Sequence, residues 1–340
     1  MTKKGKAYAR AGVDVDLGNK LKRGIQSLVR QTHVPQVLGK IGGFGGLFHA
    51  SFSRMREPVL VASIDGVGTK LKIAFAMGKH DTVGADLVNH CVNDIAVLGA
   101  RPLFFLDYIG CERLEARVFQ QLLRGLSRAC LGAGCALLGG ETAQMPGMYR
   151  KGEYDLAGCI VGVVDRTKII DGKKIKPGDV VLGLASNGLH TNGYSLAREI
   201  LFEKMRRKPD SRLPGSTITV GEELLRVHKN YQPVLAKVPV GVVKGLAHIT
   251  GGGLIDNLPR ILPSNSDAVI ETKSWRVPSI YQILQKNGNV DAEEMYQVFN
   301  MGIGMVAIVP ERDARSAMSM LSAKRIGRIE RGTGKVRLKF

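Results

Sequence analysis

In the first half of the chain, short apolar runs alternate with segments whose apolar residues recur every three or four positions. The runs predict strands and the periodic segments predict helices. Strands are predicted over residues 58–64, 102–109, 135–138 and 156–164, and helices over residues 81–99 and 114–131. The run 156–164 is almost entirely apolar, which indicates a strand covered on both faces. This alternation is typical of an α/β domain.

The pattern restarts after a polar segment, residues 165–179, which contains Asp171-Gly172 and Pro177-Gly178 and predicts a domain boundary. Beyond it, strands are predicted over 180–184, 242–248, 268–271 and 305–309, and helices over 193–205, most of 221–238, 254–262 and 313–321. Residues 206–219 predict a surface loop. We therefore expect two α/β domains, residues 1–168 and 169–340, each long enough to bury a core of its own.

Composition narrows the class of protein. Of 340 residues, 44% are hydrophobic and 23% are charged, which is typical of a folded soluble protein. We expect no membrane span, because no apolar run approaches about 18 residues, and no secretory signal, because the basic first residues lead directly to Asp14. Five cysteines without a CxxC pair predict reduced thiols and a cytoplasmic protein.

Charge is the unusual feature of the composition. Lys and Arg number 49 against 30 Asp and Glu, which gives a net charge of +19. Such an excess attracts polyanions, whether nucleotides, phosphosugars or nucleic acid, but the basic residues are mostly scattered, as on a solvated surface. The low aromatic content of 6% and the lack of a helix-turn-helix or RNP-like run argue against specific nucleic-acid binding. A steep salt dependence of nucleic-acid affinity would revive that alternative.

The first candidate site is the glycine cluster Gly42, Gly43, Phe44, Gly45 and Gly46. Backbone N–H groups free of side chains can surround phosphate oxygens. The cluster lacks the GK[ST] ending of a P-loop and is not a GxGxxG after a strand. A plain flexible loop is the alternative.

The second candidate is the run Asp65-Gly66-Val67-Gly68-Thr69-Lys70 at the end of a predicted strand. It offers a carboxylate for magnesium and a lysine for phosphate within one turn, and magnesium in proteins combines one or two carboxylates with phosphate oxygens and water. On the next helix, Asp86, His90, Asn93 and Asp94 share one face by their spacing of three and four residues. Asn93 and Asp94 lie between apolar residues, so Asp94 is a candidate second metal ligand if Asp65 is the first. A tight turn and a solvated helix face are the alternatives.

The remaining candidates follow predicted strands at glycine-rich turns. Glu141 and Thr142 come after Gly139-Gly140, at a strand end that would face a ligand in an α/β sheet. In the second domain two polar segments each join a strand to a helix, where helix N-termini favour anions. Their members are His190, Thr191 and Asn192 in the first, and His248, Thr250, Gly251 and Gly252 in the second. Thr191 or Asn192 as a simple helix cap is an alternative.

Taken in order, these blocks resemble the phosphoribosylformylglycinamidine cyclo-ligase (AIR synthetase) family over roughly residues 8–305. The matching blocks are AGVD at 11–14, GGFGGLF at 42–48, DGVGTK at 65–70, CVND at 91–94, PLFFLDY at 102–108, GGETAQMPGMY at 139–149, HTNGYSL at 190–196, HITGGG at 248–253 and FNMGIGM at 299–305. DGVG and GGET alone are shared with a wider superfamily. The blocks GGETAQMPGMY, HTNGYSL and FNMGIGM together are specific to the cyclo-ligases. Two positions depart from the family pattern: Gln144 stands where a glutamate is usual, and Gln26 where a lysine is common.

The resemblance implies a reaction and roles for the candidate residues. Formylglycinamidine ribonucleotide and ATP would give aminoimidazole ribonucleotide, ADP and phosphate. ATP would phosphorylate the formamide oxygen, and the amidine nitrogen would then close the ring. Asp65 and Asp94 would hold Mg²⁺, while Gly42–Gly45, Gly66, Gly68, Thr69, Lys70 and Asn93 would contact ATP. Glu141, His190 and His248 would act in catalysis, and Thr142, Thr191, Asn192, Thr250, Gly251 and Gly252 would bind substrate.

The resemblance also implies that the small mixed sheet of the N-terminal domain pairs with its twin to close a barrel in a homodimer. A related ATP enzyme of the selenophosphate synthetase type is the nearest rival. Such an enzyme would need a reactive cysteine in its glycine-rich loop, and residues 42–46 contain none.

Overall fold

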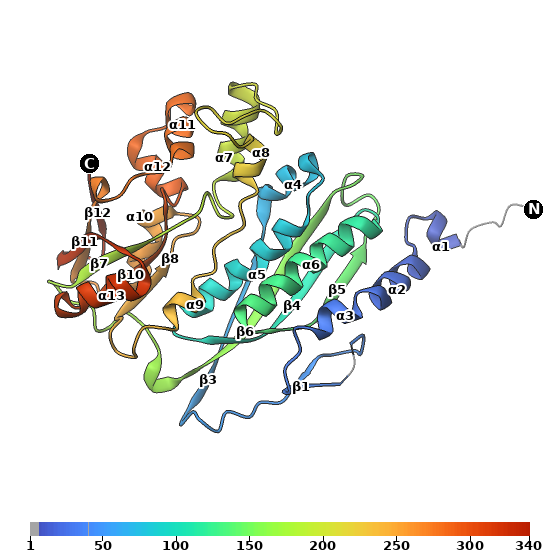
Figure 1. Ribbon diagram of the computed structural model, residues 1–340, viewed down its shortest axis with the longest axis horizontal. Helices are drawn as coiled ribbons and strands as arrows, with labels where there is room; N and C mark the ends of the chain where they lie inside the picture. Colours follow the sequence, from blue (N-terminus) through green and yellow to red (C-terminus); the bar gives the residue numbers. More distant parts are fainter. Residues whose placement is uncertain (1–6, 40) are drawn as a thin grey trace, which may run out of the picture.

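The computed structural model of the protein describes residues 7–39 and 41–340 (Figure 1). The chain forms two mixed sheets with helices packed on them, one built from residues before 166 and the other from residues after 179. The predicted fold class, two domains of α/β type, is confirmed. Within the described residues, none of the helices combines the length and apolar character needed to cross a bilayer.

The N-terminal sheet, as far as the described residues show, has the order β3 (Pro58–Gly66), β6 (Tyr154–Asp165), β4 (Arg101–Cys111), β5 (Ala136–Gln144). β6 is antiparallel to both of its neighbours, while β5 is parallel to β4. A parallel pair needs a crossover connection, and α6 (Ala116–Ala133) supplies it.

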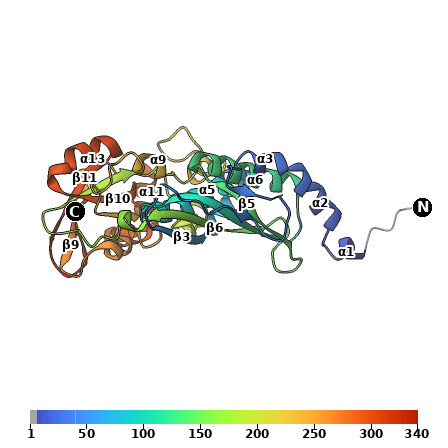
Figure 2. The ribbon, with the colours of Figure 1, turned by 90° about the horizontal axis from the view of Figure 1, so that it is seen from below.

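Helices α5 (Asp81–Ala96) and α6 cover one face of this sheet (Figure 2). They approach closely because Gly84 and Gly125 face each other's helix: a Cβ on Gly125 would lie 2.0 Å from the Asp81 carbonyl oxygen. The opposite face carries exposed apolar side chains, with Leu60 62% and Ile64 72% exposed. Within residues 7–39 and 41–340 the single chain does not close a barrel, and none of these residues covers Leu60 and Ile64.

Short elements precede the sheet. They are α1 (Ala7–Arg10), α2 (Val15–Gly24), α3 (Gln26–Arg30) and a hairpin of β1 (Val37–Leu38) with β2 (Leu47–Phe48). Leu21, Ile25 and Val29 of this segment are buried in the same core as α6. After β3 come a 3₁₀ turn, η1 (Gly68–Lys70), and α4 (Leu71–Met77).

The C-terminal sheet, within the part of the chain described, has the order β12 (Val336–Lys339), β9 (Ser266–Glu271), β11 (Lys324–Arg331), β7 (Val180–Ala185), β10 (Ile303–Val309), β8 (Gly245–His248). Both faces of its centre are buried. Met305 and Ala307 of β10 pack with α13 (Ala314–Leu321), while Val306 and Ile308, the alternate residues, belong to the core on the other side. This period of two makes the domain three-layered.

Helix α9 (Gln232–Leu235) packs in the same cluster as α13. The domain also has the helices α7 (Tyr194–Arg198), α8 (Val220–Leu224), α10 (Gly253–Asn257), α11 (Ser279–Gly288) and α12 (Ala292–Val298). The helix predicted over most of 221–238 is wrong, because only residues 221–224 and 232–235 are helical. Residues 225–231 and 236–238 are not. The predicted helix 193–205 is α7 followed by a π-helix, Glu199–Lys204.

Candidate active site at the domain junction

Two carboxylates lie where α5 and β3 meet the C-terminal domain. Asp65, at the end of β3, accepts hydrogen bonds from the Gly66 amide (2.6 Å) and from Nε2 of His90 (2.9 Å). Asp94, near the end of α5, accepts from Nδ1 of His248 (2.8 Å). The side chains of Asp65 and Asp94 remain 38% and 26% exposed, so each carboxylate is fixed by a histidine and still faces solvent.

The hydrogen bond between Asp65 and His90 changes how both groups titrate. Burial alone would raise the pKa of Asp65, but the His90 hydrogen bond and charge outweigh it, and the pKa is lowered. Burial would lower the pKa of His90, but the bond to Asp65 and the charges of Asp94 and Asp65 raise it. Each partner thus favours the charged form of the other.

A line of side chains continues from His90 into the second domain. Thr191 Oγ1 lies 2.8 Å from Nδ1 of His90 and 3.3 Å from Nδ1 of His228. Nε2 of His228 lies 2.9 Å from Nε2 of His248, which returns to Asp94. The line therefore joins Asp65 to Asp94 through three histidines and one threonine.

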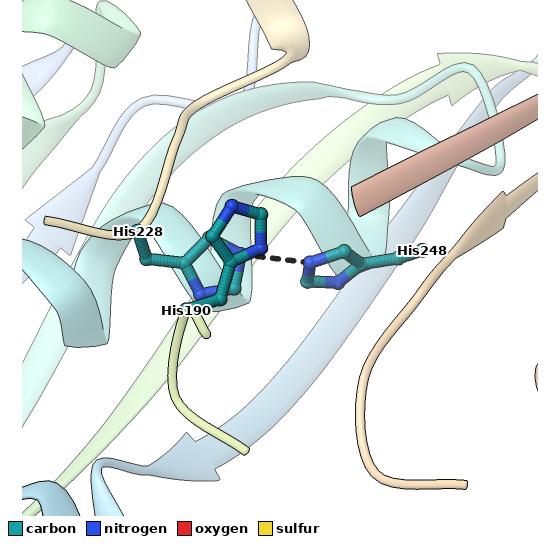
Figure 3. A group of neighbouring side chains, drawn as sticks. All are labelled: His190, His228 and His248. Atoms are coloured by element: carbon teal, nitrogen blue, oxygen red, sulfur yellow. Dashed lines mark hydrogen bonds between the residues drawn. The ribbon is translucent and has the colours of Figure 1, made fainter. Parts of the chain in front are cut away.

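His190 lies beside this line, and Figure 3 shows its ring stacked on that of His228. The ring centroids are 4.0 Å apart and the planes differ by 20°. The residue is buried with a positive φ of 63°, unusual for a residue other than glycine and common at functional sites. Both ring nitrogens are buried without a hydrogen-bond partner among the described residues.

The polar face of α5 holds an extended segment of the second domain, residues 228–231. Asp86 accepts from the amide of His228 (2.6 Å), and Asn89 donates to the carbonyl of His228 (2.7 Å). Asn93 donates to the Lys229 carbonyl (2.8 Å) and accepts from the Tyr231 amide (2.9 Å). Asn93 is fully buried in these contacts with the neighbouring domain, and its contact with a nucleotide stays a prediction.

Lys70 also joins the two domains. Its buried Nζ forms an ion pair with Asp86 (2.8 Å) and donates to the carbonyl oxygens of His190 (3.0 Å) and Arg226 (2.7 Å). Burial lowers the pKa of Lys70 and raises that of Asp86, and each charge opposes the shift of the other. All three N–H donors of Lys70 are therefore occupied within the protein, which differs from the predicted phosphate contact.

The two glycine-bearing turns of the second domain lie against each other. A Cβ on Gly251 would approach Oδ1 of Asn192 to 3.3 Å, so these turns are in contact. Asn257 secures the second turn by donating to the carbonyls of Thr250, Gly251 and Gly253. Nδ2 of Asn192 is buried without a hydrogen-bond partner among the described residues, which leaves its two N–H donors for a ligand. Thr69, from the first domain, reaches Ser195 beside these turns (3.1 Å).

Other predicted residues lie elsewhere. Gly42, Gly43, Phe44 and Gly45 form the exposed tip between β1 and β2, with the Phe44 side chain wholly exposed. Asp65 pairs across the sheet with Gly158, Gly158 with Asp107, and Asp107 with Gly140. Three strand spacings, about 14 Å, therefore separate Asp65 from the Glu141 and Thr142 region. The single chain does not bring these residues to the two carboxylates.

One residue of the site, His228, was not singled out from the sequence. Asp86 and His90 were placed on the same helix face as Asp94, but without a role at the site. His228 lies in a segment wrongly predicted as helix, and no motif marks it. Gln144, one departure from the family pattern, accepts from the Leu114 amide (3.2 Å) and donates to the Asp14 carbonyl (3.3 Å), so it has a structural use.

A cavity of about 280 Å³ lies at another part of the domain junction. Its lining is mainly apolar and includes Ala96, Ala100, Val163, Leu235 and Leu246. Of the residues described, those predicted for the site do not line it, so we place the candidate active site at the carboxylates and histidines.

Comparison with known proteins first defines the class. Residues 50–164 match the family described as AIR synthase related protein, N-terminal domain, and residues 176–339 match its C-terminal domain. Among solved structures, a thiamine-monophosphate kinase from Stenotrophomonas maltophilia K279a is 16% identical, with a TM-score of 0.68 over 93% of this chain and 95% of that one. The hydrogenase maturation protein HypE in complex with ATP is 18% identical, with a TM-score of 0.65 over 93% and 90%. These two likenesses show the fold.

Closer relatives define the family within that class. The phosphoribosylformylglycinamidine cyclo-ligase of Syntrophotalea carbinolica is 54% identical over 93% of this chain and 90% of its own. That of Geobacter metallireducens is 52% identical over 95% of this chain and 93% of its own. The chain belongs to the phosphoribosylformylglycinamidine cyclo-ligase family.

Proposed function

We propose that the protein catalyses the ATP-dependent closure of formylglycinamidine ribonucleotide to 5-aminoimidazole ribonucleotide, with release of ADP and phosphate. The observation that carries the proposal is the pair of half-exposed carboxylates, Asp65 and Asp94, fixed by histidines at the domain junction of a chain in this family. The γ-phosphoryl group of ATP passes to the formamide oxygen. The amidine nitrogen then attacks the formamide carbon, and the bond from this carbon to the phosphorylated oxygen breaks, so that the oxygen leaves as part of phosphate.

Mg²⁺ suits the donors at this site. Mg²⁺ prefers oxygen ligands and keeps several waters, and Asp65 and Asp94 offer carboxylate oxygens on a side open to solvent. Their histidine partners orient the carboxylates in the way that groups behind a metal ligand commonly do. When bound, the ion neutralises charge on the triphosphate and favours phosphoryl transfer.

The remaining residues position the substrate. The two N–H donors of Asn192 Nδ2 and the turn Thr250–Gly252 together suit an anionic group such as the substrate phosphate. We propose that the exposed tip Gly42–Gly45, with Gly66, Gly68 and Thr69 beside Asp65, contacts ATP. His248 donates its Nδ1 proton to Asp94, which leaves Nε2 as an acceptor inside the site.

We also propose a homodimer, with the uncovered sheet face as its interface. Leu60, Ile64 and Tyr108 lie exposed on the N-terminal sheet, a cost that a second copy would remove. Glu141, paired with Tyr108 at the far side of the sheet, would then act beside the partner's interface and not at Asp65 of its own chain. The cytoplasmic location stays a prediction.

The test is a coupled assay of ADP release with Mg²⁺ and ATP, run with and without the amidine substrate. We expect release only with the amidine, and a fall of at least about 100-fold in kcat for Asp65→Asn, since electrostatic contributions of this kind are worth about 10²–10³. Asp171→Asn, an exposed aspartate paired with Lys173, is the matched control and should turn over normally. Near-normal turnover of folded Asp65→Asn would reject the metal role, and no amidine-dependent ADP release would reject the reaction.

A further inference from the structure

The two closest nitrogens in the histidine group cannot both be satisfied by neutral rings. Asp65 and Asp94 accept hydrogen bonds, so His90 donates from Nε2 and His248 donates from Nδ1. Nδ1 of His90 then accepts from the Thr191 hydroxyl, whose oxygen accepts in turn from Nδ1 of His228.

That donor count leaves one lone pair on Nε2 of His228 and one on Nε2 of His248, facing each other at 2.9 Å. Two lone pairs at this distance repel. A cation would relieve this contact: either a metal ion, or an extra proton within the group, which on His90 would turn the Thr191 hydroxyl toward His228 and let His228 donate to His248.

His190 favours a metal ion. Its ring is buried against His228, and both of its nitrogens lack a partner among the described residues, at a cost unless a ligand uses one of them. Ligand nitrogens of His190, His228 and His248 lie within 4.8 Å of one another. A tetrahedral ion with bonds of about 2.0–2.1 Å spaces its nitrogens by about 3.3 Å. His190, which is stacked on His228 (Figure 3), would have to turn to direct a nitrogen at the same ion, and it breaks no hydrogen bond when it does so.

The surroundings suit metal ligands as well. Asp94 holds the far nitrogen of His248, and Thr191 holds that of His228, the arrangement typical behind metal-binding histidines. All three histidines are buried. Among neighbouring charges, Lys70 is neutralised by Asp86, and Asp65 and Asp94 are negative.

We propose that His190, His228 and His248 form a site for a borderline divalent cation of the Zn²⁺ or Co²⁺ type, separate from the Mg²⁺ position at Asp65 and Asp94. Imidazole nitrogen suits these ions, whereas Mg²⁺ prefers oxygen. The fourth coordination position is open to water. The binding itself does not depend on the proposed reaction, but one consequence does: the ion locks His190 and His248 and inhibits turnover.

The experiment is a Co²⁺ titration of the full-length, chelator-treated protein, followed by visible absorption, which reports tetrahedral coordination. We expect one Co²⁺ per chain, not displaced by excess Mg²⁺. Affinity should fall by about 10–100-fold in Thr191→Ala, which removes only the partner of a ligand, and further in His190→Gln and His228→Gln. His49→Gln, an exposed histidine, is the matched control and should bind like the wild type.

Circular dichroism checks that each variant is folded, and anomalous diffraction from a Co²⁺-soaked crystal locates the ion. Anomalous density between the three rings supports the proposal even if a variant misfolds. Density only at the carboxylates, equal affinity in all variants, or no Co²⁺ uptake overturns it and leaves a shared proton between His228 and His248. Zn²⁺ inhibition at saturating Mg²⁺ is then measured separately. Its failure together with normal Co²⁺ binding would count against the inhibitory consequence and not against the site.

Discussion

At the scale of single residues, some charged side chains at the domain junction bind the two domains together, while others remain exposed to solvent. Lys70 is the clearest case, since an ammonium predicted at a phosphate is buried against Asp86 and two carbonyls of the other domain. A lysine after a glycine turn at a strand end suits either use, and local sequence carries no information about which partner lies across the junction. Asp65 and Asp94, in contrast, were predictable because a strand end and the following helix bring them to one place.

Removing one member of the Lys70–Asp86 pair should be strongly destabilising. Lys70→Met leaves Asp86 charged, buried and without its counterion, which typically costs about 3–5 kcal/mol. We expect a clear fall in the temperature of thermal unfolding, measured by calorimetry. The double variant Lys70→Met/Asp86→Asn should recover part of that loss, whereas Lys173→Met, at an exposed pair, should change little. If the loss in the double variant equals the sum of the losses in Lys70→Met and Asp86→Asn, the two residues are not coupled.

Asp107 should make stability depend on pH in the sense opposite to most aspartates. Burial raises its pKa to about 7, above the value near 3.9 of an unfolded chain. Between these two values the folded state binds the proton and the unfolded state does not, so stability falls as pH rises and levels off above 7. The effect integrates to something on the order of 4 kcal/mol.

Asp107→Asn removes this titration. As the pH rises from 4 to 8, the unfolding temperature of the variant should therefore increase relative to that of the wild type. Asp171→Asn is a useful contrast, since Lys173 lowers the pKa of Asp171. The small stability that this gives is present above the unfolded value near 3.9, so the difference between Asp171→Asn and the wild type should be nearly constant over this range. A constant difference between Asp107→Asn and wild type across this range would show that Asp107 is ionised normally.

At the scale of elements, the apolar pattern predicted well those strands that are rich in apolar residues. β3, β4, β6, β7 and β10 lie within a few residues of their predicted bounds. Prediction failed where structure depends on partners distant in sequence. Residues 225–231 have helix-compatible composition, but their backbone groups are taken by Asp86, Asn89 and Asn93, about 140 positions earlier. β11 and β12 were missed because charged residues dominate them, and in the structure these charges pair, as Arg337 does with Glu330.

The hydrogen bonds between α5 and residues 228–231 should be testable through Asn93. Asn93→Ala leaves the Lys229 carbonyl and the Tyr231 amide without partners, at about 1–3 kcal/mol for each buried group. We expect faster hydrogen exchange at the Tyr231 amide, measured by mass spectrometry or NMR. Asn287→Ala, at a solvent-exposed position of α11, should leave that amide as slow as in the wild type. Unchanged exchange in Asn93→Ala would mean that the segment is held by other contacts.

At the scale of the whole molecule, two surfaces stand out: a basic exterior and an apolar sheet face. The net charge of +19 is not concentrated on the C-terminal strands as a free basic patch, because Arg325, Arg328 and Arg337 each meet a glutamate. The apolar face of the N-terminal sheet has no such compensation. The hydrophobic pattern alone could not reveal this face, since Leu60 and Ile64 fit the same strand pattern as their half-buried neighbours, and only the family resemblance implied a barrel closed by a second copy.

Disrupting that face should change the assembly state. Ile64→Glu places a charge where a second copy would pack, and burying it without a partner is costly. We expect light scattering after size exclusion to give a dimer for the wild type and a monomer for Ile64→Glu. Leu131→Glu, an exposed leucine on α6, tests the same chemistry on the helical side and should leave the dimer intact. A wild-type monomer at micromolar concentration would reject the proposed interface.

The position of His248 has a consequence for how the enzyme matures during translation. Asp65 and Asp94 are synthesised more than 150 residues before His248, which later holds Asp94 in place. Because domains generally fold as units from the N-terminus as the ribosome proceeds, the first domain can be complete while one acid still lacks its orienting ring. A truncated or stalled polypeptide would therefore carry both acids without an ordered site, and competence for chemistry would arise only in finished chains.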